Sequence, residues 1–201
     1  HMGGGAFHGC KNLRKVHYNA INILYDEGLH GGLPTFFNEC SAVSDVTIGE
    51  RVKSLPQGIF EGLLNLKEIF LPNSLERIQR FALASTGITS ITIPENIKYI
   101  EESALEYCQQ LVELNYNAIN IRTNGGWISN TLEKINIGPR VVKIPDFLAY
   151  RCKKLTNIII PENIDSIGDW AFYGCVNLES QKFPTNLKHI GGMAFYGCTS
   201  L

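Results

Sequence analysis

Six cysteines and five histidines are the residues of this 201-residue chain most able to do chemistry, as metal ligands, disulfide partners or nucleophiles. The sequence consists of similar units of 22 or 23 residues, and each cysteine occupies the same position in its unit. This position lies three residues after the one that Phe172 holds in the unit of Cys175. The six are Cys10, Cys40, Cys108, Cys152, Cys175 and Cys198. One shared position favours a buried ladder of small apolar thiols. Zinc is disfavoured because its four ligands must converge on a point, whereas a ladder spreads them along a line.

A ladder also places Cys175 near Cys152 and Cys198 in adjacent turns, at a spacing that permits a disulfide if the parent protein is secreted. Oxidation of these thiols therefore stays open. No arrangement of Ser, His and Asp stands out, and no glycine-rich loop has the phosphate-binding pattern. The histidines outside the first residue fall in different columns, at His8, His17, His30 and His189. We expect no catalytic residue, no metal site, no cofactor and no enzyme activity.

The charge pattern excludes two classes of partner. Lys and Arg number 18 against 19 Asp and Glu, and no run of like charge marks a surface for nucleic acid or anionic lipid. No apolar stretch approaches the roughly 18 residues of a membrane-spanning helix. We therefore expect neither nucleic-acid binding nor membrane insertion of this segment. Residues 1–5 are interpreted as the remnant of a tag and a linker, and residues 6–201 as a repeat array cut at both ends.

The sequence repeats with a period of 22 or 23 residues, so the elements of this repeat must hold any functional site in place. The phrase AFYGC at residues 171–175 returns at 194–198, and a related phrase begins at residue 6. A β-branched phrase such as ITSITIP at 88–94 favours a strand, an Ile-x-x-Ile phrase favours a second short extended segment, and Ala-Phe-x-x-Cys suits a tight turn. The period predicts a solenoid of about eight coils, with parallel strands and inward apolar residues that stack between coils.

Two units depart from this frame in the same way. The phrase YNAINI at residues 18–23 reappears 98 residues later, at 116–121, and each copy runs on into a pair of glycines, at 31–32 and 125–126. We expect both segments to leave the coil as loops on one side. The shared departure also suggests a larger repeat of about four coils.

The order Leu-x-x-Ile-x-Ile-Pro, Ile-x-x-Ile-Gly and Ala-Phe-x-x-Cys, as in residues 155–175, resembles the BspA-like leucine-rich repeats, also called the Treponema pallidum type. The resemblance covers nearly the whole chain. It implies a right-handed leucine-rich-repeat coil with parallel strands and short turns or 3-10 segments. It also implies a secreted or surface-anchored protein of a host-associated bacterium or a protist parasite, with a role in adhesion to host proteins and cells. It supplies no catalytic residue.

The outward strand residues predict where a ligand binds, because the concave face of such a coil presents them in an even array. The candidates are Lys15, His17, Glu68, Phe70, Thr92, Asn115, Asn136, Asn157, Ile159 and Lys182. Phe70 and Ile159 are the apolar exceptions, and either they anchor a partner or they pack within the strand ladder. The expected ligand is a host-derived protein or glycan outside the cell or at its surface. The alternatives are a structural spacer and an accessory domain of a larger surface protein.

Overall fold

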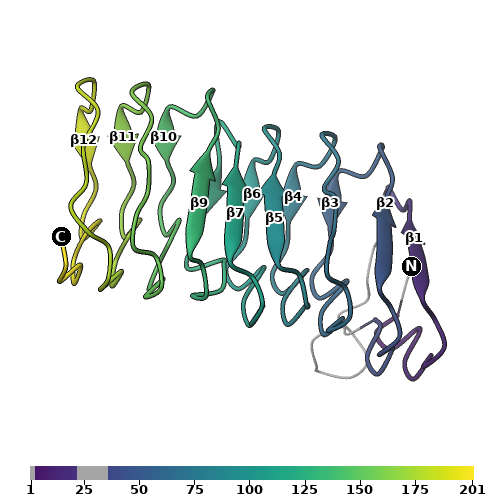
Figure 1. Ribbon diagram of the computed structural model, residues 1–201. Coiled ribbons are helices and arrows are strands. Elements are labelled where there is room, and N and C mark those ends of the chain that lie inside the picture. The colour runs from purple at the N-terminus through teal and green to yellow at the C-terminus, as the bar shows by residue number, and fades with distance from the viewer. Residues whose placement is uncertain (1–2, 22–35) are drawn as a thin grey trace.

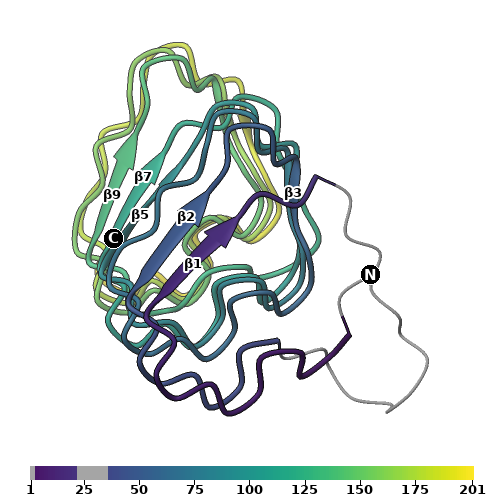
Figure 2. The same ribbon diagram turned by 90° about the vertical axis from the view of Figure 1, so that its right-hand side faces the viewer.

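Each described strand pairs in parallel with the equivalent strand of an adjacent coil, because the intervening chain is long enough to return to the same edge. This computed structural model describes residues 3–21 and 36–201, and those residues contain no helix. The coils lie side by side along one axis, with the two ends of the chain at opposite ends of the array (Figure 1). Viewed along the axis, the coils lie nearly on top of one another around a common interior (Figure 2).

Two kinds of strand occur along the chain. Four-residue strands are β1 (Lys15–Tyr18), β2 (Asp45–Ile48), β5 (Ser90–Ile93), β7 (Glu113–Tyr116) and β9 (Lys134–Ile137). Two-residue strands are β3 (Ser54–Leu55), β4 (Arg77–Ile78), β6 (Tyr99–Ile100), β8 (Arg122–Thr123), β10 (Lys143–Ile144), β11 (Ser166–Ile167) and β12 (His189–Ile190). The predicted strand phrase and the predicted Ile-x-x-Ile segment are both confirmed as extended elements.

The register follows the inward apolar residues. Ile91 lies opposite Leu114, and Leu114 lies opposite Ile135, so equivalent positions of three coils stack directly. All three side chains are buried, while their neighbours in the same strands point outward. Because a slip of one residue would turn this whole set to solvent, the apolar columns hold the register.

Tight turns close each coil at the Ala-Phe-x-x-Cys phrase. The backbone N–H of Cys175 donates to the Phe172 carbonyl at 3.2 Å, which is the i to i+3 bond of a short 3-10-like turn. Phe172 also donates to the carbonyl of Ala194 in the next coil at 2.8 Å. Phe147 and Trp170 adopt positive φ angles of 59° and 57° in these turns, a region that bulky side chains rarely occupy.

The loop prediction is wrong for the second YNAINI copy. Tyr116 ends β7 and is buried, because it lies in register between Ile93 and Ile137. Ala118 is also buried, and residues 122–123 then pair with β6 as β8. This segment therefore stays in the coil. In the first copy Tyr18 is buried at the end of β1, and residues 22–35 lie outside the described residues.

Two details of the solenoid differ from expectation. The strand phrases at residues 66–72, 155–161 and 178–184 follow the path of the coil without forming regular strands. The short-strand ladder has seven rungs from β3 to β12 among the described residues, so about six turns separate its ends. The sequence predicted about eight coils, so the two counts differ slightly.

Candidate functional site

The four-residue strands form one side of the solenoid together with the equivalent segments 67–71, 156–160 and 179–183 (Figure 2). We name this side the long-strand face. All ten residues selected from the sequence lie on it, and each is exposed or half-buried. They extend over the whole array and do not gather at one point.

The middle of the long-strand face is a row of small polar residues. Thr92, Asn115 and Asn136 are direct neighbours in the register of β5, β7 and β9. The Asn136 amide donates to Asn115 Oδ1 and to Glu113 Oε1, both at 2.7 Å. Lys134 pairs with Glu113 at 2.9 Å, and this hydrogen bond lowers the pKa of the Glu113 carboxyl. These polar groups already bind one another, so they offer little to a ligand.

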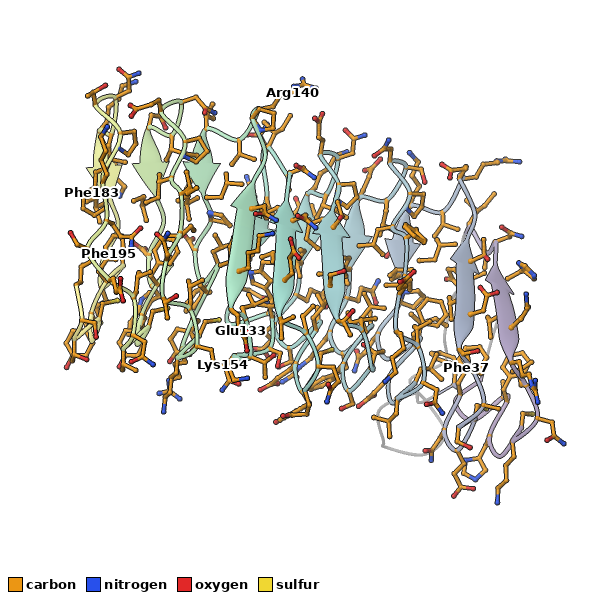
Figure 3. All side chains as sticks on the ribbon, in the orientation of Figure 1. Phe37, Glu133, Arg140, Lys154, Phe183 and Phe195 are labelled. Carbon is orange, nitrogen blue, oxygen red and sulfur yellow. The ribbon has the colours of Figure 1, made fainter. Side chains whose placement is uncertain are left out.

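Backbone pairing stops at two places, which we call seams. The first seam lies between residues 36–48 and 58–71, and the second lies between residues 122–137 and 143–160. No backbone hydrogen bond joins the two sides of either seam within the ranges that the structure describes. Side chains bridge the second seam instead, where Thr123 donates to the Asp146 carbonyl at 3.0 Å and Lys154 pairs with Glu133 at 3.0 Å (Figure 3).

A bulky ring precedes each seam in one column of the repeat, the column that Ala171 and Ala194 occupy in the AFYGC phrase, which we name the alanine column. Most coils have Ala or an aliphatic residue at this corner, such as Ala104 and Leu148. The coil before each seam has Phe36 or Trp127 there, and both rings are fully buried. We infer that a larger ring at the corner widens the spacing to the next coil, because the packed interior cannot be compressed. Wider spacing would account for the missing backbone hydrogen bonds between those coils among the described residues.

The first seam opens a groove of about 730 Å³ on the long-strand face, between β2 and residues 68–73. Asp45, Glu50 and Glu68 line it, and no basic side chain does. Phe70 stands at its edge with 81% of its surface exposed. The backbone N–H groups of Asp45 and Gly49 donate to carbonyls of the β1 coil. Because successive N–H groups of a strand point to opposite sides, the N–H groups of Val46 and Ile48 point toward the groove.

The second seam opens a groove of about 460 Å³ between β9 and residues 156–161. Asn136, Asn157 and Ile159 line it, and Ile159 is 78% exposed. Glu133 also lines this groove, and it pairs with Lys154 across the seam (Figure 3). Each seam therefore pairs a groove with one exposed apolar side chain.

The ten residues selected from the sequence differ in whether they line a groove, and in which groove they line. Glu68 and Phe70 share the first groove, and Asn136, Asn157 and Ile159 share the second. Lys15 and His17 lie on β1, and Lys182 lies in the segment beyond Ile159. Asp45 and Thr47 are not among the ten candidates, although they line the first groove and occupy the same two outward columns. Their column positions, equivalent to Lys15 and His17, are the sequence signal for them.

The cysteine ladder is confirmed for four of its six members. Cys40, Cys108, Cys152 and Cys175 are buried, Cys198 is half-buried, Cys10 is exposed, and all six are free thiols. The thiol of Cys175 donates to the Ala149 carbonyl of the preceding coil at 3.1 Å, and Cys198 bonds to Phe172 in the same way at 3.1 Å. Burial raises the pKa of Cys175 to about 12, so this thiol is neutral at physiological pH.

We expect thiol reactivity to follow this order of burial. A thiol-specific reagent at pH 8 should modify Cys10 rapidly, Cys198 slowly and the four buried cysteines only after denaturation, because the thiolate is the reactive form. Mass spectrometry of modified peptides measures each site. In denaturant without reductant, all six thiols should react. Recovery of only four or two would show that adjacent members of the ladder are oxidised.

No group of three or more His, Cys, Asp or Glu side chains converges as a metal site among the residues that the structure describes. Across the same residues, no helix has the length and apolar character needed to cross a membrane.

A family model for the BspA type leucine-rich repeat region matches residues 34–144 and 121–201, with six copies. The chain belongs to this family. The two matched segments overlap at residues 121–144, which lead into the second seam. The BspA-type repeat is a domain of the kind found in surface proteins, and this is consistent with a protein-binding module. Such repeats typically act as binding modules without enzyme activity.

Solved structures of bacterial leucine-rich repeat proteins are similar to this BspA-type chain. One is a cell surface protein from Faecalibacterium prausnitzii, with 20% identity, coverage of 100% of this chain and 75% of the other, and a TM-score of 0.47. The T. pallidum leucine-rich repeat protein has 20% identity, coverage of 94% and 72%, and a TM-score of 0.48. A Bacteroides ovatus protein has 18% identity, coverage of 98% and 80%, and a TM-score of 0.43. No curated protein sequence matches the chain.

Proposed function

We propose that the chain is a non-enzymatic binding module of a secreted or cell-surface protein, and that it adheres to a host protein or glycan through the long-strand face. The observation that carries the proposal is the pairing of each groove with a highly exposed apolar residue, Phe70 or Ile159. Exposed apolar side chains beside a concave surface are common anchors in protein recognition. A protein partner fits these two apolar edges best.

Charge adds a preference at the first groove. Asp45, Glu50 and Glu68 line it without a basic neighbour in the lining, and Lys15 pairs with Asp45 at 3.2 Å from the β1 side. A basic segment of a partner would complement these carboxylates and associate faster with them. The backbone groups of Val46 and Ile48 that face the groove could also bond to an extended segment of that partner.

A structural spacer is the second candidate function, and the middle of the face favours it. The row of Thr92, Asn115 and Asn136 is small and polar, and the Asn136 amide donates to Asn115 within it. A spacer needs only such a solvated surface. It gives no reason for two bulky apolar side chains to stay exposed at the seams, so binding remains the better account.

Removing both apolar anchors tests the binding proposal. We expect Phe70→Ala combined with Ile159→Ala to weaken binding to a responsive member of a panel of immobilised extracellular-matrix proteins by roughly fivefold or more. The melting temperature should hardly change, because both side chains are exposed. Surface plasmon resonance measures the affinity, and calorimetry measures the melting temperature.

Tyr99→Ala provides the matched control, since Tyr99 is an exposed aromatic residue on the short-strand side. It should leave the affinity unchanged. Equal binding by the double variant and the unaltered chain would refute the site assignment. A large fall in melting temperature would instead show that Phe70 and Ile159 stabilise the strand ladder.

A further inference from the structure

A ladder of aromatic rings runs along the turns of the last three coils, away from the long-strand face. The rings of Tyr150, Tyr173 and Tyr196 stack with centroids 5.2 Å apart at each step. Phe147 and Trp170 stack beside them at 6.3 Å. Tyr150 and Tyr173 are half-buried and Tyr196 is exposed. We name Phe147, Tyr150, Trp170, Tyr173 and Tyr196 the turn ladder.

The turn ladder stops at the second seam. The coil that precedes Tyr150 has Gly126 and Ser129 at the positions equivalent to Phe147 and Tyr150. The bridge between Leu105 and Ile128 fixes this alignment, because it places Trp127 in the alanine column. One more ring at the same spacing would therefore fall above Ser129, where the small side chain leaves the space open. A hollow of about 280 Å³ lies there, bordered by Tyr107 on one side and by Tyr150 on the other.

The rim of this hollow is rich in hydrogen-bonding groups. Glu106, Gln109, Asn130 and Arg151 line it, and none of these side chains makes a hydrogen bond or ion pair with another described residue. Arg151 lies over the Tyr150 ring, with its guanidinium carbon 5.1 Å from the ring centroid. The hollow thus places the exposed ring of Tyr107 beside one carboxylate, two amides and one guanidinium that can bind a ligand.

We propose that this hollow binds one pyranose ring of a saccharide, as a site separate from the long-strand face. The apolar C–H face of a sugar stacks on the exposed ring of Tyr107, because the negative face of an aromatic ring attracts such hydrogens. The hydroxyls around the ring bond to Glu106, Gln109, Asn130 and Arg151. The hollow is slightly smaller than pockets for drug-sized ligands, which span about 300 to 1,000 Å³, and this suits a single ring.

Other ring-shaped ligands fit the surroundings less well. An aromatic side chain of a partner would desolvate four polar groups and satisfy at most one of them, which is unfavourable. A quaternary ammonium group would meet Arg151, whose positive charge already occupies the Tyr150 ring. A sugar has a hydroxyl on most ring carbons and no net charge, so it satisfies the rim without repulsion.

Saturation-transfer NMR tests the site with the methyl glycosides of glucose, galactose, mannose and N-acetylglucosamine at millimolar concentration. We expect transfer from the protein to the ring C–H protons of at least one glycoside. Tyr107→Ala should reduce that signal by roughly fivefold or more. Tyr107 is 58% exposed, so its truncation leaves the core intact.

Two control variants separate this site from other surfaces. Tyr196→Ala truncates an aromatic residue that is 62% exposed at the far end of the turn ladder and does not line the hollow, and it should leave the signal unchanged. The double variant of Phe70 and Ile159 should also bind the glycoside normally, so failure of the long-strand proposal would not affect this result. No transfer to any of the four glycosides, an equal signal with Tyr107→Ala, or transfer only to adenosine or tryptophan amide in parallel samples would overturn the proposal.

Discussion

Replacing Tyr116 with alanine is expected to lower the free energy of unfolding by about 4 kcal/mol. Tyr116 is 1% exposed and lies between Ile93 and Ile137 in the register of the long-strand ladder. Its loss leaves a cavity in the middle of the array, where stacking coils hold one another in place. Urea denaturation followed by tryptophan fluorescence measures the change.

Tyr116→Phe provides the matched control. The Tyr116 hydroxyl is buried and has no hydrogen-bond partner among the described residues. Removing the oxygen while keeping the ring should therefore leave the stability unchanged or slightly increased. If the alanine variant were as stable as the phenylalanine variant, the segment at 116–123 would not be part of the packed coil, and the loop prediction would be restored.

Replacing Gly168 with alanine is expected to cost about 3 kcal/mol, because two coils approach each other too closely for a side chain at this position. A Cβ atom there would meet Asp146 Oδ1, and it would lie 2.6 Å from the Asp146 nitrogen and 2.8 Å from the Pro145 carbonyl carbon. The obstacles are partly backbone atoms, which cannot rotate away. Differential scanning calorimetry should show a lower melting temperature.

Gly192 offers a control in the following coil. A Cβ atom at Gly192 would have only Asp169 Oδ1 within reach, at 3.7 Å, which is ordinary van der Waals contact. Gly192→Ala should leave the melting temperature unchanged or raise it slightly, because alanine restricts the unfolded chain more than glycine does. Similar losses in both variants would mean that the tight coil spacing at Gly168 is not the cause.

The repeated columns predicted the interior of the fold. Each inward position must match its equivalents in neighbouring coils, so residues such as Ile91, Leu114 and Ile135 are recognisable from spacing alone. Tyr116 also obeys the alternation of its strand, two residues after Leu114. Its unit was interpreted as a loop because the YNAINI phrase sits where the proline and the second extended segment are expected, and then runs on into glycines. Alternation of inward residues was therefore a better guide than the loss of one turn signal.

The candidate site was predicted only in part. The outward columns locate Phe70 and Ile159 correctly on the long-strand face, since side chains alternate along a strand. The grooves beside them depend on the seams, which no local pattern of the strands reveals. Phe36 and Trp127 mark the seams in the alanine column, but the resulting loss of backbone pairing depends on the packing of whole coils. The packing of neighbouring coils is set only in the folded array, so the sequence of one repeat does not reveal it.

The most direct test of the central claim is to locate where a partner touches the protein. A photoreactive benzoylphenylalanine introduced at Phe70 should crosslink to a protein of cultured epithelial cells on illumination, because the side chain is 81% exposed at the edge of the first groove. The same photoreactive residue at Tyr99, on the short-strand side, serves as the reference. We predict a discrete crosslinked product from position 70 and none from position 99. Products from position 99 alone, or equal products from both positions, would contradict binding through the long-strand face.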